Sequence, residues 1–299
     1  MAEPLYVVLG ATGHVGGVIA SRLLDQKKKV RVVGRDAAKL RPFADRGAES
    51  ATASVEDSAS LAKAFAGGTA AFVLVPPNSQ VREFRAYQRR VVEAIASALE
   101  AARVPRVVSL SSIGADRPDQ NGPVAGLYEM EQRLNRLAAD VLHLRPGFFM
   151  ENNLMSIGMI KGMGMNGSAT RGDLKLPMIA THDIGEVAAR RLAALDFTGK
   201  GALELMGPRD VTMAEVTIAL GRAIGKPDLK YVQFPYEDAK KGLVGMGLPE
   251  EMAGLYVELS KGFNDGAAKA TQPRSAATTT PTTIESFADK VFAPAYRAS

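Results

Sequence analysis

Three glycines near the N-terminus, Gly10, Gly13 and Gly16, have the spacing of a phosphate-binding turn. They follow a short apolar run, residues 5–9, and an amphipathic stretch begins at Val15. Glycine allows a tight turn and a close approach of the backbone to a ligand. The start of the following helix offers unpaired N–H groups and a partial positive charge. This order of strand, turn and helix predicts a site for the pyrophosphate of a dinucleotide.

Arg35 and Asp36 follow the second apolar run, where the adenosine ribose of a dinucleotide is recognised. An acid at this point favours the 2′-hydroxyl of NAD, whereas a cation favours the 2′-phosphate of NADP. Arg35 can pair with a phosphate in a bidentate way, and Lys39 is a second cation one turn into the next helix. Asp36 could instead bind the ribose of NAD or cap the helix that it precedes. The pattern favours NADP(H), with NAD(H) as the alternative.

The first half of the chain alternates short apolar runs with amphipathic stretches. Runs rich in Val, Leu and Ile are typical of parallel strands that helices cover on both faces. The expected strands cover residues 5–9, 30–34, 48–53, 70–75, 106–111 and 141–145. The expected helices cover about 15–26, 37–46, 58–66, 79–102 and 125–138. Right-handed crossovers then give an α/β, Rossmann-type doubly wound parallel sheet, whose ligands bind at the carboxyl ends of the strands.

The sequence changes character near residue 148, after which Gly, Met and Asn are frequent and the alternation is lost. Asp183 is expected to cap a helix, and two capping boxes are expected to open further helices, one from Thr212 to Glu215 and one from Thr282 to Glu285. The further elements expected are helices over 184–195, 236–245 and 249–263 and strands over 202–206 and 230–234. We expect a NAD(P)-binding domain over 1–147, to which some later segments return, and a smaller, discontinuous α/β substrate lobe over 148–299.

Composition narrows the classes of protein. The 299 residues are 46% hydrophobic and 23% charged, as in ordinary soluble domains, and no apolar run reaches the length of a membrane span. The chain has no cysteine and three histidines, and without metal-ligand spacing no metal is expected. The net charge of +5 is scattered, with no basic stripe for nucleic acid. No secretory signal is recognised, so we expect a cytoplasmic monomer or homodimer.

Several segments, taken in order, resemble the NmrA-like branch of the atypical short-chain dehydrogenases. They are GATGHVGG (10–17), Arg35, RVVSLSSIGAD (106–116), MEQRL (130–134), LHLRPGFFMENN (142–153) and TTIESFADKVFAPAY (282–296). The resemblance covers nearly the whole chain, and it implies an NAD(P)-binding protein of Rossmann type.

The family pattern implies a role for each residue that matches it. Around the pyrophosphate it places Gly10, Thr12, Gly13, His14, Val15 and Gly16. It assigns Arg35 to the 2′-phosphate. Bordering the ribose are Val75, Pro76 and Pro77. Beneath the nicotinamide and along its far side are Ser111, Ser112, Pro146, Gly147 and Phe148.

The chain departs from the family pattern at the proton donor. Short-chain dehydrogenases pair a tyrosine with a lysine four residues later, because the lysine lowers the tyrosine pKa. Here Tyr128 is followed by Gln132, so the lysine is missing. Tyr128 is retained as the candidate catalytic residue, with ring packing as the alternative. We expect Glu131 to be a helix-surface carboxylate, with orientation of a ribose hydroxyl or of a lid residue as the alternative. We expect His143 to be hydrogen-bonded and half-buried.

Residues after 148 are expected to form the substrate pocket. Met155, Met159 and Met163 repeat on one helical face, which suits a core, a subunit contact or a flexible apolar pocket. Phe148 and Phe149 add aromatic surface. The polar groups expected to orient a substrate carbonyl are those of Asn152 and Asn153.

Two functions follow as hypotheses. The first is an NADPH-dependent reductase that transfers hydride to an apolar, electron-poor acceptor, such as a quinone, azo dye, enone or imine. Such acceptors can take their proton from water, so the missing lysine need not abolish turnover. The second is a regulator that senses NADP(H) and acts through a protein partner without chemistry. The Met- and Phe-rich segment favours the first hypothesis, and the missing lysine favours the second.

Overall fold

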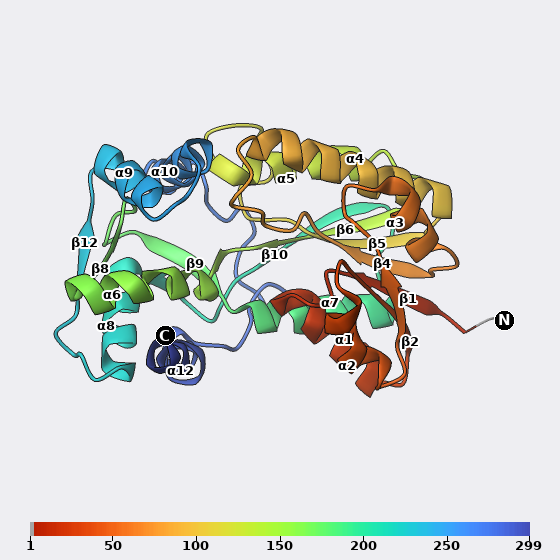
Figure 1. The fold of residues 1–299 in the computed structure, drawn as a ribbon, viewed down its shortest axis with the longest axis horizontal. Coiled ribbons are helices and arrows are strands. Elements are labelled where there is room, and N and C mark those ends of the chain that lie inside the picture. Colours follow the sequence, from red (N-terminus) through yellow and green to blue (C-terminus); the bar gives the residue numbers. More distant parts are fainter. Residues whose placement is uncertain (1–2) are drawn as a thin grey trace.

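A seven-stranded parallel sheet forms the larger part of the molecule (Figure 1). The computed structural model describes residues 3–299. The strands, in spatial order, are β10 (Lys200–Leu205), β6 (Asp140–Pro146), β5 (Arg106–Leu110), β4 (Ala70–Val73), β1 (Leu5–Leu9), β2 (Lys29–Gly34) and β3 (Glu49–Thr52). Each neighbouring pair is parallel, which confirms the predicted Rossmann-type doubly wound sheet.

Helices cover both faces of this sheet, and successive strand residues pack against opposite layers. Val7 and Leu9 belong to the core under one layer, while Tyr6 and Val8 belong to the core under the other. The first layer consists of α3 (Ser58–Phe65), α4 (Phe84–Ala102) and α5 (Ala125–Leu134). The second layer consists of α1 (His14–Asp25), α2 (Ala37–Ala44) and α7 (Thr181–Ala194). Burial on both faces explains why the strand sequences are continuously apolar.

Two predicted helices are shorter in the structure. Helix α4 begins at Phe84 rather than near residue 79, because Pro76 and Pro77 start an irregular segment that ends in a turn at Asn78. Helix α5 ends at Leu134 rather than near 138, where the chain tightens into turns.

A smaller lobe is built on a third apolar core. Its three-stranded sheet has the order β11 (Asp210–Thr212), β9 (Lys175–Ile179) and β7 (Phe148–Phe149). Two further strands pair with each other, β12 (Lys230–Gln233) and β8 (Met165–Ser168). The remaining elements are η1 (Gly122–Val124), η2 (Met150–Ser156), α6 (Ile157–Met163), α8 (Met213–Ala223), α9 (Tyr236–Gly245), α10 (Glu250–Asn264), α11 (Ile284–Phe287), η3 (Ala288–Phe292) and α12 (Ala293–Ala298). Strands β7, β8, β9 and β11 were not predicted, since they are short and lack clean alternation.

Two helix caps predicted from the sequence are wrong, and the two residues concerned bind each other instead. Asp183 lies inside the first turn of α7, and its carboxylate accepts hydrogen bonds from the backbone N–H and hydroxyl of Thr282, at 2.9 and 2.8 Å. The carboxylate at the start of α7 belongs to Glu151, which accepts from Thr181 N at 3.0 Å and from its hydroxyl at 2.6 Å. Thr283, not Thr282, caps α11.

The other predicted capping box is confirmed at the start of α8. Thr212 Oγ1 accepts from Glu215 N at 3.1 Å, and the Glu215 carboxylate accepts from Thr212 N at 2.7 Å. Within residues 3–299 we find no helix with the length and apolar character needed to cross a bilayer.

Candidate cofactor and substrate cleft

The glycine loop between β1 and α1 forms a turn that larger residues would not fit. Gly10 has a φ of +72°, and its N–H donates to Val33 O at 2.9 Å. A Cβ atom on Gly16 would lie 2.3 Å from Gly10 O, so the helix backbone passes directly against the loop. Two of the predicted glycines are therefore required by the turn itself, independently of any ligand.

The start of α1 has no side-chain cap among the described residues. Gly13 occupies the cap position, the first turn contains no acid, and Thr12, Gly13 and His14 are exposed. By contrast, α2 and α3 begin at capping aspartates, and a carboxylate is bonded to the first backbone N–H groups of α4 and α7. The N–H groups and positive end of α1 are therefore open to an anion.

Arg35 lies directly after β2, at the same edge of the sheet as the glycine loop. It is exposed and makes no hydrogen bond or ion pair with any residue from 3 to 299, and Lys39 is also exposed. Asp36 caps α2, since its Oδ1 accepts from Ala38 N at 2.9 Å and from Lys39 N at 3.4 Å. The capping interpretation of Asp36 is confirmed, and its carboxylate is committed to that role.

The segment after β4 borders the glycine loop. Leu74 packs against Gly10, and a Cβ atom there would lie 2.8 Å from Leu74 Cδ2. Val75, Pro76 and Pro77 follow, and the Tyr87 hydroxyl on α4 donates to Pro76 O at 3.1 Å. Burial raises the pKa of Tyr87, so its hydroxyl stays protonated as that donor. The ribose contact implied for residues 75–77 stays a prediction.

A buried hydrogen-bonded network joins β5, β6 and α5 at the carboxyl edge of the sheet. Ser111 Oγ donates to Glu131 Oε1 at 2.5 Å, while Arg145 donates to both carboxylate oxygens, from Nε at 2.9 Å and from Nη2 at 2.6 Å. The Glu131 side chain is only 2% exposed. The expectation of a helix-surface carboxylate is therefore wrong, because α5 turns this residue toward the sheet. Ser112 is partly exposed, and its hydroxyl donates to Ile113 O.

His143 lies two residues before Arg145, and both are on the same face of β6. Its Nδ1 accepts from the Ser109 hydroxyl at 2.7 Å, and its Nε2 lies 2.9 Å from Asn135 Oδ1. The hydrogen bonding was predicted correctly, but the residue is 2% exposed rather than half-buried. Burial lowers the pKa of His143 to about 4, so the ring is neutral near pH 7.

The chain crosses from the sheet to the small lobe at Pro146, Gly147 and Phe148. A Cβ atom on Gly147 would lie 1.8 Å from Pro177 O, so only glycine fits beside β9. The Phe148 ring meets that of Phe263 on α10 edge to face, with 6.1 Å between centroids. Phe263 was not predicted, because it comes from a helix distant in sequence.

The substrate residues predicted after 148 fall into different environments. Asn152 is exposed, whereas Asn153 is buried and donates to Met150 O at 2.9 Å. Met155 is 53% exposed and Met159 is half-buried. The core interpretation of the methionine face is wrong for Met155, since the buried side chains here are Ile157 and Ile160. Contact of these residues with a substrate stays a prediction.

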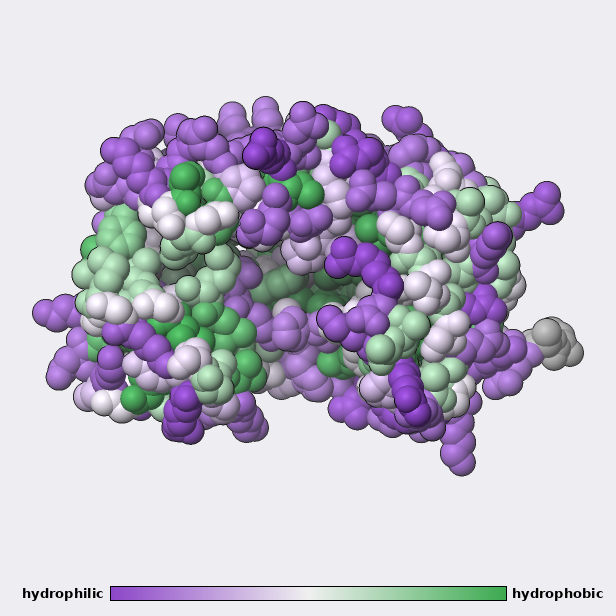
Figure 2. All heavy atoms as spheres, in the orientation of Figure 1, coloured by the Kyte–Doolittle hydropathy of each residue, from purple (hydrophilic) through white to green (hydrophobic). Residues whose placement is uncertain are grey.

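A hollow lies between the two lobes on the face shown in Figure 2, with apolar residues in its depth. Tyr128 is half-buried on α5, and its hydroxyl has no hydrogen-bond partner among residues 3–299.

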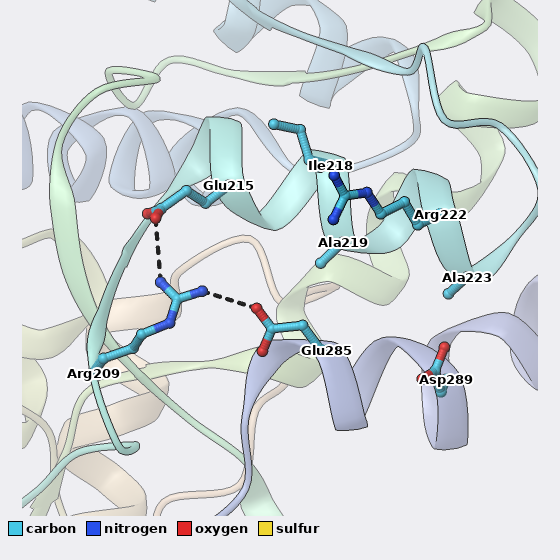
Figure 3. Close-up of a pocket in the computed structure, with 8 residues that line it drawn as sticks. All are labelled: Arg209, Glu215, Ile218, Ala219, Arg222, Ala223, Glu285 and Asp289. Carbon is cyan, nitrogen blue, oxygen red and sulfur yellow. Dashed lines mark hydrogen bonds and ion pairs between the residues drawn. The ribbon is translucent and has the colours of Figure 1, made fainter.

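A separate surface pocket of about 360 Å³ lies in the small lobe, where Arg209 pairs with Glu215 and Glu285 at 3.2 and 2.8 Å (Figure 3). None of the predicted site residues lines that pocket.

The sequence matches the model of the NmrA-like family over residues 4–288. The chain belongs to this family. It is 32% identical over 257 residues to an NAD(P)H azoreductase from Xenophilus azovorans, covering 85% of this chain and 86% of that protein.

Two solved structures have the same fold. An NADPH-dependent quinone oxidoreductase from Escherichia coli, in complex with NADPH, has a TM-score of 0.80 at 23% identity, over 96% of this chain and 99% of that one. The negative transcriptional regulator NmrA, in complex with NAD, has a TM-score of 0.71 at 15% identity, over 100% of this chain and 98% of that one. Proteins of this fold thus include both a reductase and a regulator.

Proposed function

We propose that this protein is an NADPH-dependent reductase that transfers hydride to an apolar, electron-poor acceptor. The observation that carries the proposal is the uncapped start of α1 behind a glycine turn, which fits a pyrophosphate. The similarity to an azoreductase over 85% of the chain supports oxidoreductase chemistry. A bound nicotinamide cofactor would supply the hydride.

The preference for NADP(H) over NAD(H) rests on Arg35. Its guanidinium is free at the end of β2, where the 2′-phosphate of the cofactor would lie. In the competing interpretation Asp36 binds the ribose of NAD. Its carboxylate, however, accepts two backbone hydrogen bonds as the cap of α2. Lys39 adds a second positive charge one turn further on.

The acceptor class rests on the apolar hollow and on the rings of Phe148 and Phe149. A planar, electron-poor molecule buries its faces well against aromatic and methionine side chains. Asn152 is the exposed amide of the pair, and so we assign to it the polar contact with a substrate. Tyr128 remains the candidate proton donor, and water is the alternative donor.

The experiment follows the absorbance of NADPH with a quinone, an azo dye, an enone and an imine as acceptors. We expect oxidation that depends on both enzyme and acceptor, with NADPH preferred to NADH. Silence toward every acceptor would contradict the proposal. Tyr128→Phe adds a second test, since an unchanged kcat would remove this residue as the donor.

A second candidate is a sensor that binds NADP(H) without turning it over. Gln132 in place of lysine favours it, because Tyr128 then has no cation to lower its pKa. A sensor must bind the oxidised and reduced cofactors with different affinities. Unequal dissociation constants for NADP⁺ and NADPH, together with silence toward all acceptors, would support the sensor.

A further inference from the structure

One guanidinium nitrogen at the carboxyl edge of the sheet, Nη1 of Arg145, is left without a partner among residues 3–299. Glu131 holds the Nε and Nη2 atoms of Arg145, but Nη1 makes no hydrogen bond with any residue from 3 to 299. Glu204 lies opposite Arg145 in the strand register, yet its carboxylate accepts from Thr271 N and Gln272 N, both at 2.8 Å. Nη1 is therefore a spare donor.

The Arg145 side chain keeps a small accessible part near the carboxyl end of β6. Strand β6 lies between β5 and β10, and α5 covers the face on which Arg145 points. Arg145 is the next-to-last residue of β6, and its side chain is 16% exposed. A few side-chain atoms of the described residues are fully buried and lack a hydrogen-bond partner. Nη1 of Arg145 is not one of them. The exit left to it is the carboxyl edge of the sheet, where ligands of this fold bind.

The Glu131 carboxylate makes Arg145 a rigid donor. Two parallel hydrogen bonds fix the plane of the guanidinium, and Ser111 donates to Oε1, the same carboxylate oxygen that accepts from Nε. The hydrogen bonds that Arg145 donates to Glu131 raise the pKa of the arginine, which is therefore charged near pH 7. A fixed, charged donor in a partly dry site stabilises developing negative charge without reorganisation.

On the basis of the reductase function proposed above, we propose that Arg145 Nη1 is an oxyanion donor for carbonyl-type acceptors. As hydride forms a new bond to the acceptor, the carbonyl π pair moves onto the oxygen. Arg145 stabilises that oxyanion and keeps its own proton, water supplies the proton that completes reduction, and the dinucleotide leaves oxidised.

The test compares two acceptors that differ in the charge that hydride creates. A naphthoquinone becomes an oxyanion, whereas a cationic triarylmethane dye becomes neutral. Arg145→Met alone would leave Glu131 buried without its partner, so it is combined with Glu131→Gln. We expect the ratio of kcat/KM for quinone to that for dye to fall by about 100-fold, the usual loss for one oxyanion donor.

The matched control is Arg133→Met, on the same helix as Glu131. Arg133 pairs with Glu93 and Glu100 on the outer face, at 2.9 and 3.0 Å, and its side chain is 18% exposed. This control should leave the ratio unchanged. Equal losses for both acceptors in the double variant, or an equal change in the Arg133 control, would overturn the proposal.

A second measurement needs no turnover. Calorimetry with the anion of 2-hydroxynaphthoquinone reports oxyanion binding directly, and we expect its Kd to rise at least 10-fold in the double variant. Glu131→Gln alone should give a smaller rise, because Arg145 is still present. An unchanged Kd in the double variant would overturn the proposal. If the wild type reduces neither acceptor, the reductase function fails, while this measurement still decides the role of Arg145.

Discussion

The glycine-loop end of the cleft, comprising Gly10–Gly16 and Arg35, exposes polar groups that have no partner in the described chain. The β5–β6 end, comprising Ser111, Glu131, His143 and Arg145, encloses almost all of its polar groups in hydrogen bonds with one another. Burying an unpaired polar group is costly, whereas leaving it in water is not. The first end can therefore take up a ligand without losing a hydrogen bond within the described chain, whereas the second holds the fold together while presenting one spare donor.

The contrast predicts that substitutions at the β5–β6 end change stability, while those at the glycine-loop end change binding. The largest effect is expected for Glu131→Ala, which leaves the Arg145 charge buried without its partner. Breaking a buried pair in this way costs about 3–5 kcal/mol of unfolding free energy. Urea unfolding measures this loss of unfolding free energy. Glu129→Ala is the control on the same helix, since its exposed ion pair, 3.7 Å long, should contribute little.

His143 gives the β5–β6 end a pH dependence. The unfolded chain takes up a proton near pH 6.5, but the folded ring does so only near pH 4. Its contribution to stability is complete above pH 6.5, falls by about 3 kcal/mol as the pH drops to 4, and is constant below that. Unfolding free energies of His143→Gln across this range should lack that slope. The exposed His182→Gln variant should retain it, and a slope shared by both variants would contradict the assignment.

Gly13→Asp converts the open start of α1 into a capped one. The backbone of Gly13 is extended, with φ −94° and ψ 172°, which aspartate can adopt as a helix cap, and its Cβ would lie 3.3 Å from Gly10 O. Its carboxylate would occupy the anion site, and we expect the Kd for NADPH to rise by roughly 100-fold while the protein still folds. Gly13→Asn, a cap without charge, should weaken NADPH less. Equal effects of the two substitutions would show that charge at this position is irrelevant.

Arg35→Ala tests the other group at the glycine-loop end. We expect NADPH to bind about 10-fold more weakly, with little change for NADH, because only NADPH carries the 2′-phosphate. Calorimetric titration with each cofactor gives both constants. Equal weakening of the two would place Arg35 away from the 2′-phosphate.

Local sequence patterns were sufficient for the glycine-loop end. Its strand, turn and helix follow one another within residues 5–25, so the spacing of Gly10, Gly13 and Gly16 already defines the turn. The capping role of Asp36 depends on the next three residues only. Short-range geometry of this kind can be predicted from the order of residues.

The β5–β6 end could not be predicted in the same way. Ser111, Glu131 and Arg145 come from three separate elements, and nothing in the order of residues indicated that α5 turns Glu131 inward. Asp183 and Thr282 each carried a plausible local capping signal, but the fold placed them 2.8 Å from each other, although they are 99 residues apart. Phe148 and Phe263 are likewise distant in sequence, and only the fold brings their rings into contact.

The sequence by itself therefore determined the order of strands and helices in the first half of the chain, the doubly wound sheet and the glycine turn, because each depends on periodicity and neighbouring residues. Tertiary structure decided which polar side chains meet. It paired Glu131 with Arg145, buried His143, placed Glu151 at the start of α7 and left Nη1 of Arg145 without a partner among residues 3–299. The physical reason is that a buried polar group must find a partner wherever the packed elements bring one, regardless of distance along the chain.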